Sequence, residues 1–276
     1  MKLINYFSPA KKIILFVIIA IFITSCATSP MGRKQFILIG DNEMNKMGIA
    51  SFTKMKTSTQ VSTNPQAQRY VRCVASAIVN ELPQEWRKQA WEVVVFEDNS
   101  ANAFALPGGK IGVHTGLLKV ATNQDQLATV IGHEVAHVLS RHGAERVSQQ
   151  MGLEIAMQAT DAISKNKMQN QGSQRALMSA LGLGAQFGVL LPFSRTHESE
   201  ADLYGIDLMA KAGFDPRQSV NLWQNMAKAS GGKRQPQFMS THPNPEKRIE
   251  KLSNYMPHAL ELQKQAHANG KNPRCK

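Results

Sequence analysis

The chain has 276 residues, of which 42% are hydrophobic and 19% charged. This is an ordinary composition for a globular protein, and the length allows one large domain or at most two. The net charge of +12 is unusual and would suit either nucleic acid or an anionic membrane surface as a partner.

Residues 1–26, MKLINYFSPAKKIILFVIIAIFITSC, are typical of a secretory signal peptide that ends at a cysteine. Lysines form its positive start, and the apolar run 13–23 is too short to span a bilayer as a helix. Small residues before Cys26, followed by Ala27, resemble the lipobox of bacterial lipoproteins. The resemblance implies cleavage before Cys26, lipid on its sulfur and sorting to the outer membrane. The alternative is an uncleaved helical anchor; both place the mature chain outside the cytoplasm and argue against nucleic acid as a partner.

We expect four segments: a signal peptide (1–25), a lipidated tether (26–40), the main domain (41–262) and a basic tail (263–276). Loss of the three signal-peptide lysines lowers the net charge from +12 to +9, which an anionic lipid surface explains.

Two cysteines remain in the mature chain besides the lipidation site. Cys73 and Cys275 are an even number in an oxidising compartment, where a disulfide would tie the tail to the body. Two unpaired thiols are the alternative, because the sequence does not show that these residues approach each other.

In the first half of the chain, helical spacing predicts a helix over residues 41–56 and a second one from Asn64-Pro65 up to Pro83. The β-branched run 91–96, WEVVVF, predicts a strand. Residues 102–113, NAFALPGGKIGV, predict two short strands around a Pro-Gly-Gly turn.

In the second half, Asn123 as N-cap and Gly143 as C-cap bound a predicted helix of about five turns. The polar stretch 149–175 predicts a partly helical connector, and the tail after about residue 262 is expected to be loose. The apolar stretch 176–193 predicts a buried core helix, with a membrane-active segment as the alternative.

Two more helices are expected, over residues 195–212 up to Gly213 and from Pro245 onward. Mostly helix with one small, early sheet is typical of the α+β class.

The predicted helix from Asn123 contains the heptapeptide IGHEVAH. Residues four apart share one helical face, so His133 and His137 can reach a single ion, while Glu134 is turned about 100° away and can act on water. This H-E-x-x-H pattern is typical of two imidazoles on zinc with a carboxylate as general base. The alternative is two surface histidines on a solvated face.

A catalytic zinc needs a third protein ligand. His142 lies five residues beyond His137 and is turned well off that face. The segment SRTHESEAD (194–202) offers Glu198, with Asp202 one turn later to accept the other N–H of a zinc-bound histidine. His197 and Glu200 are weaker options, and a solvated helix N-terminus is the alternative reading of the acidic residues.

Four segments resemble metallopeptidase family forty-eight, the HtpX-like and CAAX-prenyl-protease-like zinc endopeptidases: NAFALPGGKIGVHTGLL (102–118), HEVAHVLSRH (133–142), SRTHESEAD (194–202) and THPNPEKRI (241–249). With GRKQFILI they span roughly residues 32–252. The resemblance implies a zincin-type α+β fold and Zn²⁺ on His133, His137 and Glu198, with Glu134 as base and Asp202 behind the ligands.

The resemblance also implies two roles that the residues alone do not give. His242 would stabilise the oxyanion of the tetrahedral intermediate, with Arg248 as a candidate supporting residue. Asn102, Ala103, Phe104 and Ala105 would form an edge strand that binds extended peptide through its backbone. Ordinary sheet packing of Phe104 is the alternative.

Unlike the membrane-embedded relatives, this chain has no long apolar segment beyond the signal peptide and the doubtful stretch 176–193. It resembles a lipid-tethered branch of the family, for which we expect proteolytic quality control in the cell envelope. Protein and peptide substrates are the expected partners, and the outer-membrane assembly machinery is a candidate. The alternative is a chaperone-like envelope lipoprotein with structural zinc, but neither Cys73 nor Cys275 lies near the histidines in sequence.

Overall fold

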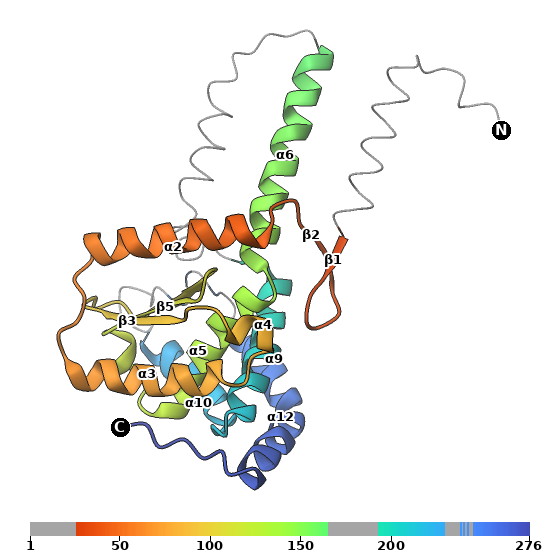
Figure 1. Ribbon diagram of the computed structural model, residues 1–276. Coiled ribbons are helices and arrows are strands. Elements are labelled where there is room, and N and C mark those ends of the chain that lie inside the picture. Colours follow the sequence, from red (N-terminus) through yellow and green to blue (C-terminus); the bar gives the residue numbers. More distant parts are fainter. Residues whose placement is uncertain (1–25, 165–192, 230–237, 239, 241, 243–244) are drawn as a thin grey trace.

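The computed structural model describes residues 26–164, 193–229, 238, 240, 242 and 245–276 (Figure 1). These residues confirm the predicted α+β class, being mostly helical with two small sheets. The strands are β1 (Cys26–Thr28), β2 (Lys34–Phe36), β3 (Glu92–Phe96), β4 (Ala103–Leu106) and β5 (Lys110–His114). The helices are α2 (Asp41–Ser58), α3 (Pro65–Val79), α4 (Gln84–Arg87), η2 (Leu117–Lys119, a 3-10 turn), α5 (Gln124–Leu139), α6 (His142–Ser164), α9 (Arg195–Lys211), α10 (Gln218–Ala229) and α12 (Pro245–Ala268).

The larger sheet has the strand order β3-β5-β4, so β4 lies at an edge. Strands β3 and β5 are parallel, whereas β4 and β5 form the predicted hairpin. The hairpin turn contains Gly108 and Gly109, whose φ angles of 84° and 71° favour glycine. No described strand pairs with the outer side of β4, and this side faces the residues of the site.

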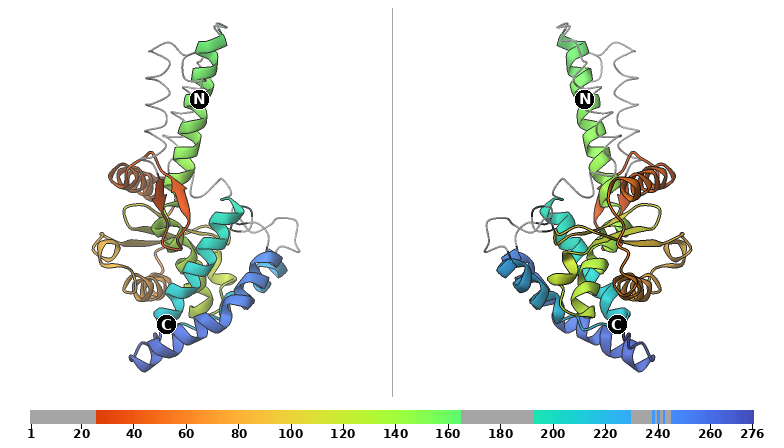
Figure 2. Two further views of the ribbon diagram at one scale, coloured as in Figure 1. Left: turned by 90° about the vertical axis from the view of Figure 1, so that its right-hand side faces the viewer. Right: turned by 90° about the vertical axis from the view of Figure 1, so that its left-hand side faces the viewer.

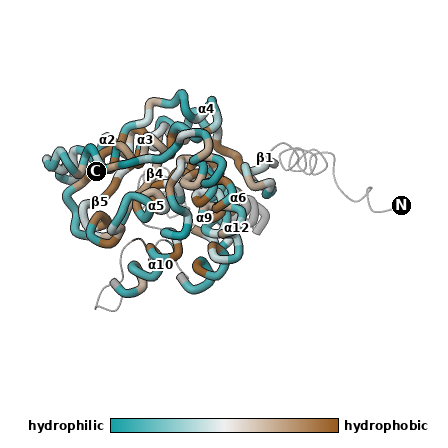
Figure 3. Tube along the Cα trace, turned by 90° about the horizontal axis from the view of Figure 1, so that it is seen from below, coloured by the Kyte–Doolittle hydropathy of each residue, from teal (hydrophilic) through white to brown (hydrophobic). Residues whose placement is uncertain are grey.

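Different helices cover the two faces of this sheet (Figure 1). Successive strand residues alternate between the faces because a strand has a period of two. Phe96 and Phe104 pack on Phe52 of α2, while Val95 and Ile111 join the main core with α3 and α5. Figure 3 shows hydrophobic stretches among the facing helices and strands and hydrophilic residues along the outer turns.

Helices α5 and α9 cross with almost no side chain between their backbones. A Cβ atom on Gly132 would lie 2.7 Å from the carbonyl oxygen of Gly205, and one on Gly205 would lie 2.8 Å from the backbone nitrogen of His133. Any larger residue at either position would push the helices apart, because protein interiors have no room to spare. The glycine pair therefore sets how closely His133 approaches the side chains of α9.

The predicted C-terminal end of the helix that carries the H-E-x-x-H motif, at Gly143, is wrong. Helix α5 ends at Leu139, the chain turns at Ser140 and Arg141, and α6 begins at His142, so Gly143 lies inside a new helix. Arg141 has a φ of 51°, a left-handed conformation that redirects the chain. Residues after the turn therefore no longer follow the helical spacing of α5. Helix α6 projects from the rest of the described residues (Figures 1 and 2).

Both ends of the described chain are better fixed than the sequence predicts. The expected tether contains the β1–β2 hairpin, in which Cys26 pairs with Phe36. The expected loose tail is wrong: α12 extends to Ala268, and Cys275 forms a disulfide with Cys73 of α3, with 5.6 Å between their Cα atoms. The expectation of a possible tail-to-body bridge is thereby met.

The predicted signal peptide and the apolar stretch 176–193, apart from Phe193, lie outside the described residues. Among the helices that the structure does describe, none is both long and apolar enough to cross a bilayer.

Candidate active site

Helix α5 places both histidines of the H-E-x-x-H motif on one buried face. It begins after Asn123, whose side chain accepts hydrogen bonds from the backbone N–H groups two and three residues further on, at 3.1 and 2.9 Å. His133 and His137 converge, with their Nε2 atoms 3.0 Å apart. Each is 3% exposed, which excludes the alternative of two surface histidines.

Helix α9 brings Glu198 to these two histidines. The helix begins at Arg195 because the Ser194 side chain accepts a hydrogen bond from the backbone of His197 (3.2 Å). The carboxylate oxygens of Glu198 lie 3.6 Å from Nε2 of His133 and 3.6 Å from Nε2 of His137. Glu198 is 3% exposed, so the alternative of a solvated acidic helix end is wrong for this residue.

His242 lies among these three side chains. Its Nδ1 atom is 2.9 Å from both carboxylate oxygens of Glu198 and 3.2 Å from Nε2 of His133. The imidazole is 1% exposed and stacks on the ring of Phe238, with 4.4 Å between ring centroids. Its nitrogen therefore belongs to the same cluster as the predicted ligands, a position closer to them than sequence reasoning implied.

The four side chains have the donors and the spacing of a metal site. The donor atoms of His133, His137, Glu198 and His242 all lie within 4.8 Å of one another, and all four residues are buried. Zinc bonds of about 2.1 Å in a tetrahedron hold neighbouring ligand atoms roughly 3.4 Å apart. The contacts found here, from 2.9 to 3.6 Å, bracket that spacing. Imidazole and carboxylate donors in this arrangement fit a zinc ion.

The protein environment keeps His133, His137 and Glu198 in the protonation states that a metal needs. Burial, assisted by the charge of Arg248, lowers the pKa of His133 to about 4, and burial also lowers the pKa of His137 well below its ordinary value. Burial alone would raise the pKa of Glu198, but the charges of His242 and Arg248 outweigh it and lower that pKa. Neutral imidazoles and an ionised carboxylate at neutral pH are what metal binding requires.

Asp202 and Arg248 hold the ligands from behind. Asp202 Oδ1 lies 3.1 Å from Nδ1 of His133, and a carboxylate there fixes the tautomer that leaves Nε2 free to bind. Arg248 donates from Nε to Asp202 (2.7 Å), pairs through Nη1 with Glu198 (2.9 Å) and lies 3.8 Å from the ring centroid of Trp223. The guanidinium thus fixes Glu198 and Asp202 together, a clearer role than the sequence provides.

Glu134 lies beside the cluster and outside the donor set. Its Oε1 atom is 3.3 Å from Nε2 of His242, and its carboxylate lies near the backbone of Ala105 on β4. Burial raises the pKa of Glu134 to about 7, against the opposing charge of His242. A carboxyl group with such a pKa can take and release a proton near neutral pH, as a general acid–base group must.

The predicted peptide-binding segment 102–105 contributes mainly backbone. Phe104 packs on Phe52 and Phe96, on the face of the sheet away from the site. The Asn102 carbonyl accepts a hydrogen bond from the His114 N–H of β5, so by alternation the backbone groups of Ala103 and Ala105 point away from β5, on the side where Ala105 lies near Glu134. The buried side-chain nitrogen of Asn102 has no hydrogen-bond partner among the described residues. Peptide binding along β4 remains a prediction.

A second buried polar cluster lies on the other side of His137. Arg33, in the turn between β1 and β2, makes two bonds to Glu145 of α6 (2.8 and 2.6 Å) and one to Glu200 of α9 (2.8 Å). His142 lies 3.0 Å from Glu200 through Nε2 and 2.9 Å from Nδ1 of His137 through its own Nδ1. We call the following set the hairpin cluster: Arg33, His142, Glu145, His197 and Glu200.

The hairpin cluster contains His197 and Glu200, the two residues that the sequence offers as weaker candidates for the third zinc ligand. Glu200 is turned toward Arg33, and His197 Nε2 contacts Glu145 Oε2 at 3.0 Å. His142 reaches His137 only because the chain breaks between α5 and α6. The sequence contains one signal for this cluster, which is Arg33 in the segment expected to be a tether. The β1–β2 hairpin that positions Arg33 is too short to show a strand periodicity.

Two crossing helices, converging imidazole and carboxylate donors and an adjacent buried glutamate are the arrangement of an H-E-x-x-H metallopeptidase site. Comparison with known protein families agrees with this class. Residues 65–256 match Peptidase family M48, and the chain belongs to that family.

Named relatives extend the comparison. Mitochondrial metalloendopeptidase OMA1 of Schizosaccharomyces pombe is 40% identical over 171 residues, covering 61% of this chain and 48% of the relative. Metalloendopeptidase OMA1 of Danio rerio is 30% identical over 93% of this chain and 56% of its own length. Beta-barrel assembly-enhancing protease of Escherichia coli is 27% identical over 83% of this chain and 47% of its own length. The chain thus spans about half the length of these curated relatives.

Proposed function

We propose that the chain is a zinc-dependent metalloendopeptidase, tethered to the outer membrane through lipid on Cys26, that hydrolyses misfolded or unassembled envelope proteins. The observation that carries the proposal is the buried Glu134 carboxylate beside four converging metal donors. The relatives support it, because their names describe metalloendopeptidases and a protease that enhances β-barrel assembly.

In this proposal the side chains divide the work of peptide hydrolysis. His133, His137 and Glu198 hold zinc, which supplies Lewis-acid polarisation of a carbonyl and lowers the pKa of water. The Glu134 carboxylate takes a proton from the attacking water and delivers it to the departing amine nitrogen. Asp202 keeps the His133 ring in its binding orientation.

His242 has a distinct part in the proposal. A catalytic zinc site needs three protein ligands and one open position, and His242 is a fourth donor within 4.8 Å of the other three. In the proposal His242 is not a zinc ligand and lies beside the three that are. From a neighbouring position its N–H can donate a hydrogen bond to the oxyanion that develops on the scissile carbonyl.

The proposed location rests on the N-terminal residues rather than on the relatives, whose names include both mitochondrial and bacterial proteins. The lipobox-like sequence ending at Cys26 favours the envelope, with the outer-membrane assembly machinery as a candidate partner. Labelling with a radioactive fatty acid tests this part: the wild-type chain should take up label and Cys26→Ser should not.

The decisive experiment uses the full chain purified in detergent with an unfolded β-barrel protein as substrate. We expect zinc in the purified protein, cleavage that stops with a chelator, and recovery on adding zinc. Glu134→Gln should keep the zinc and lose cleavage by about 10²- to 10⁴-fold, the usual contribution of a general base. Full cleavage by Glu134→Gln would contradict the assignment.

The same experiment separates the alternative of a chaperone-like envelope lipoprotein that assists the assembly of outer-membrane proteins. A wild-type chain that suppresses aggregation of the β-barrel protein without cutting it, with or without chelator, would favour that alternative.

A further inference from the structure

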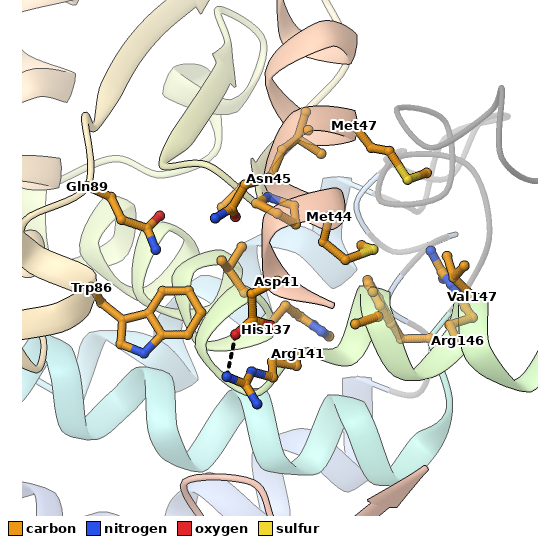
Figure 4. Close-up of a pocket in the computed structure, with 18 of the residues that line it drawn as sticks. Asp41, Met44, Asn45, Met47, Trp86, Gln89, His137, Arg141, Arg146 and Val147 are labelled. Atoms are coloured by element: carbon orange, nitrogen blue, oxygen red, sulfur yellow. Dashed lines mark hydrogen bonds and ion pairs between the residues drawn. The ribbon is translucent and has the colours of Figure 1, made fainter. Parts of the chain in front are cut away.

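A cavity of about 250 Å³ is lined by His137 but not by the other three metal donors (Figure 4). Its walls come from α2, α4, the end of β4 and the start of α6. Much of the lining is apolar, including the side chains of Met44, Met47, Trp86, Leu106, Val147 and Phe193.

We propose that this cavity is a substrate subsite that binds one large apolar side chain, of the leucine, methionine or phenylalanine class, from the peptide being cleaved. The inference rests on the proposed peptidase function and adds a substrate preference to it.

The position of the cavity makes it reachable from the scissile bond. The His137 ring belongs both to the metal donors and to the cavity lining, and Ala105 belongs both to the contact with Glu134 and to the lining. A peptide extended along β4 advances about 3.3 Å per residue. A side chain one or two residues from the cut would therefore lie over the cavity, which follows β4 through Leu106 and Pro107.

The chemistry of the lining selects an apolar occupant. Methionine side chains such as Met44 and Met47 adapt to differently shaped apolar groups. The charged pair of Asp41 and Arg141 also lines the cavity; the side chains are 44% and 39% exposed, and the two residues already neutralise each other (Figure 4). A charged occupant would lose hydration without gaining a partner from that pair. Arg146, 4.2 Å from the ring of Phe193, makes an acidic side chain the competing occupant.

The size of the cavity favours one side chain over a longer segment or a separate ligand. Pockets for drug-sized molecules typically have volumes of ~300–1,000 Å³. The cavity is smaller than that range, and its α2 wall lies outside residues 65–256, the part that matches the family. The preference it confers therefore depends on an element that the family match does not include.

Gly143 offers a direct way to fill the cavity. It lines the cavity within α6, and a Cβ atom built on it would meet only Met44 Cε, at 3.6 Å, an ordinary contact. Gly143→Met would therefore place a long side chain in the cavity without backbone strain. Gly40→Met is the matched control, because Gly40 is exposed, does not line the cavity and has no atom within 4 Å of a built Cβ.

The test compares peptide pairs that differ by leucine or alanine at each position near the cut. We expect the wild-type chain to prefer leucine at one position by ~10-fold or more in kcat/KM. Gly143→Met should remove most of that preference while zinc content stays unchanged, and Gly40→Met should retain it. The inference is overturned if no position prefers a large apolar residue, if an acidic residue is preferred, or if Gly143→Met leaves the preference intact.

Binding measured on an inactive chain separates this inference from the peptidase proposal. Fluorescent leucine and alanine peptides are titrated into Glu134→Gln, with and without Gly143→Met. Tighter leucine binding that Gly143→Met removes, together with a wild-type chain that never cleaves, would overturn only the peptidase function. Equal binding of both peptides, together with zinc-dependent cleavage by the wild type, would overturn only the subsite.

Discussion

The metal-donor cluster and the hairpin cluster are built from the same residue types and differ in where their positive charge comes from. In the hairpin cluster, Arg33 lies between Glu145 and Glu200 and neutralises both carboxylates. In the donor cluster, three imidazoles surround Glu198, and Arg248 approaches that carboxylate from outside while binding Asp202. Buried histidines and glutamates therefore do not by themselves define a metal site.

What distinguishes the two clusters is how closely their donor atoms converge. In the donor cluster, three imidazoles and one carboxylate place their donor atoms within 4.8 Å of one another, although Arg248 also contacts Glu198 and the His133 ring. Imidazole and carboxylate donors that converge in this way can share one ion. The first cluster is expected to bind metal and the second to stabilise the fold, although both contact the same ring, that of His137.

The largest expected effect comes from removing a metal donor. Glu198→Ala should weaken zinc binding by well more than the ~10- to 100-fold that loss of a residue behind the ligands causes. Arg33→Ala should weaken zinc binding by no more than that ~10- to 100-fold, because Arg33 reaches the ligand His137 only through Glu200 and His142. Competition with a fluorescent zinc chelator measures both. Equal losses in the two variants would erase the distinction between the clusters.

The next effect concerns stability. Arg33→Ala leaves Glu145 and Glu200 buried without their cation, so we expect a loss of about 3–5 kcal/mol in the free energy of unfolding. Arg33→Lys should recover only part, because lysine cannot reproduce the two-pronged contact with Glu145. Urea unfolding followed by circular dichroism provides the measurement. Lys56→Ala, which removes a half-exposed pair with Glu92, is the control and should cost about 1 kcal/mol or less.

A smaller effect tests the crossing that brings the donor residues together. Gly205→Ala would bring a Cβ atom within 2.8 Å of the His133 backbone, so α5 and α9 must separate, at a cost of about 1–3 kcal/mol. Zinc affinity should fall as well, because α9 carries Glu198. Gly143→Ala, whose Cβ atom would make only an ordinary 3.6 Å contact with Met44, should instead be neutral or slightly stabilising. Unchanged zinc affinity in Gly205→Ala would show that the crossing does not position the site.

The smallest expected effect is a pH dependence specific to the hairpin cluster. Burial would raise the pKa of Glu200, but hydrogen bonds from His142, Ser29 and Arg33 lower it to about 2. A depressed pKa in the folded chain stabilises it above pH ~4.5, and this stabilisation is lost as the pH falls toward 2. Between pH 5 and 3, metal-free wild type should lose about 1–2 kcal/mol more than Glu200→Gln. Parallel loss in both chains would contradict the role given to Glu200.

Helical spacing predicts the elements of the donor cluster because its signals are local. The cap at Asn123 and the four-residue spacings on α5 and α9 each belong to a single helix. Where the structure departs from prediction, the cause is a contact between distant elements or a single turn. The position of His242 depends on its packing against Phe238, and the left-handed turn at Arg141 turns His142 back toward His137.

The hairpin and the chain end show the same limit. Three-residue strands such as β1 and β2 carry no periodicity, and Arg33 acquires a role only when α6 and α9 supply its carboxylates. The tail after residue 262 looks loose because it is polar, yet its last turn of chain is bound to α3 through Cys275 and Cys73. The polar composition of the tail indicates contact with solvent, but it does not show whether a disulfide fixes the tail to the rest of the chain.

Strand β1 begins at the residue proposed to carry lipid, and its pairing with β2 has a consequence for reach. A protein held by a long flexible leash can swing and sample a wide volume, whereas one whose first residue is already locked into a folded hairpin stands at a nearly constant height above the bilayer. With acyl chains at Cys26, the active site would stay within a thin layer next to the lipid. In the proposed lipid-tethered form, polypeptides held near that surface would be better substrates than those free in solution.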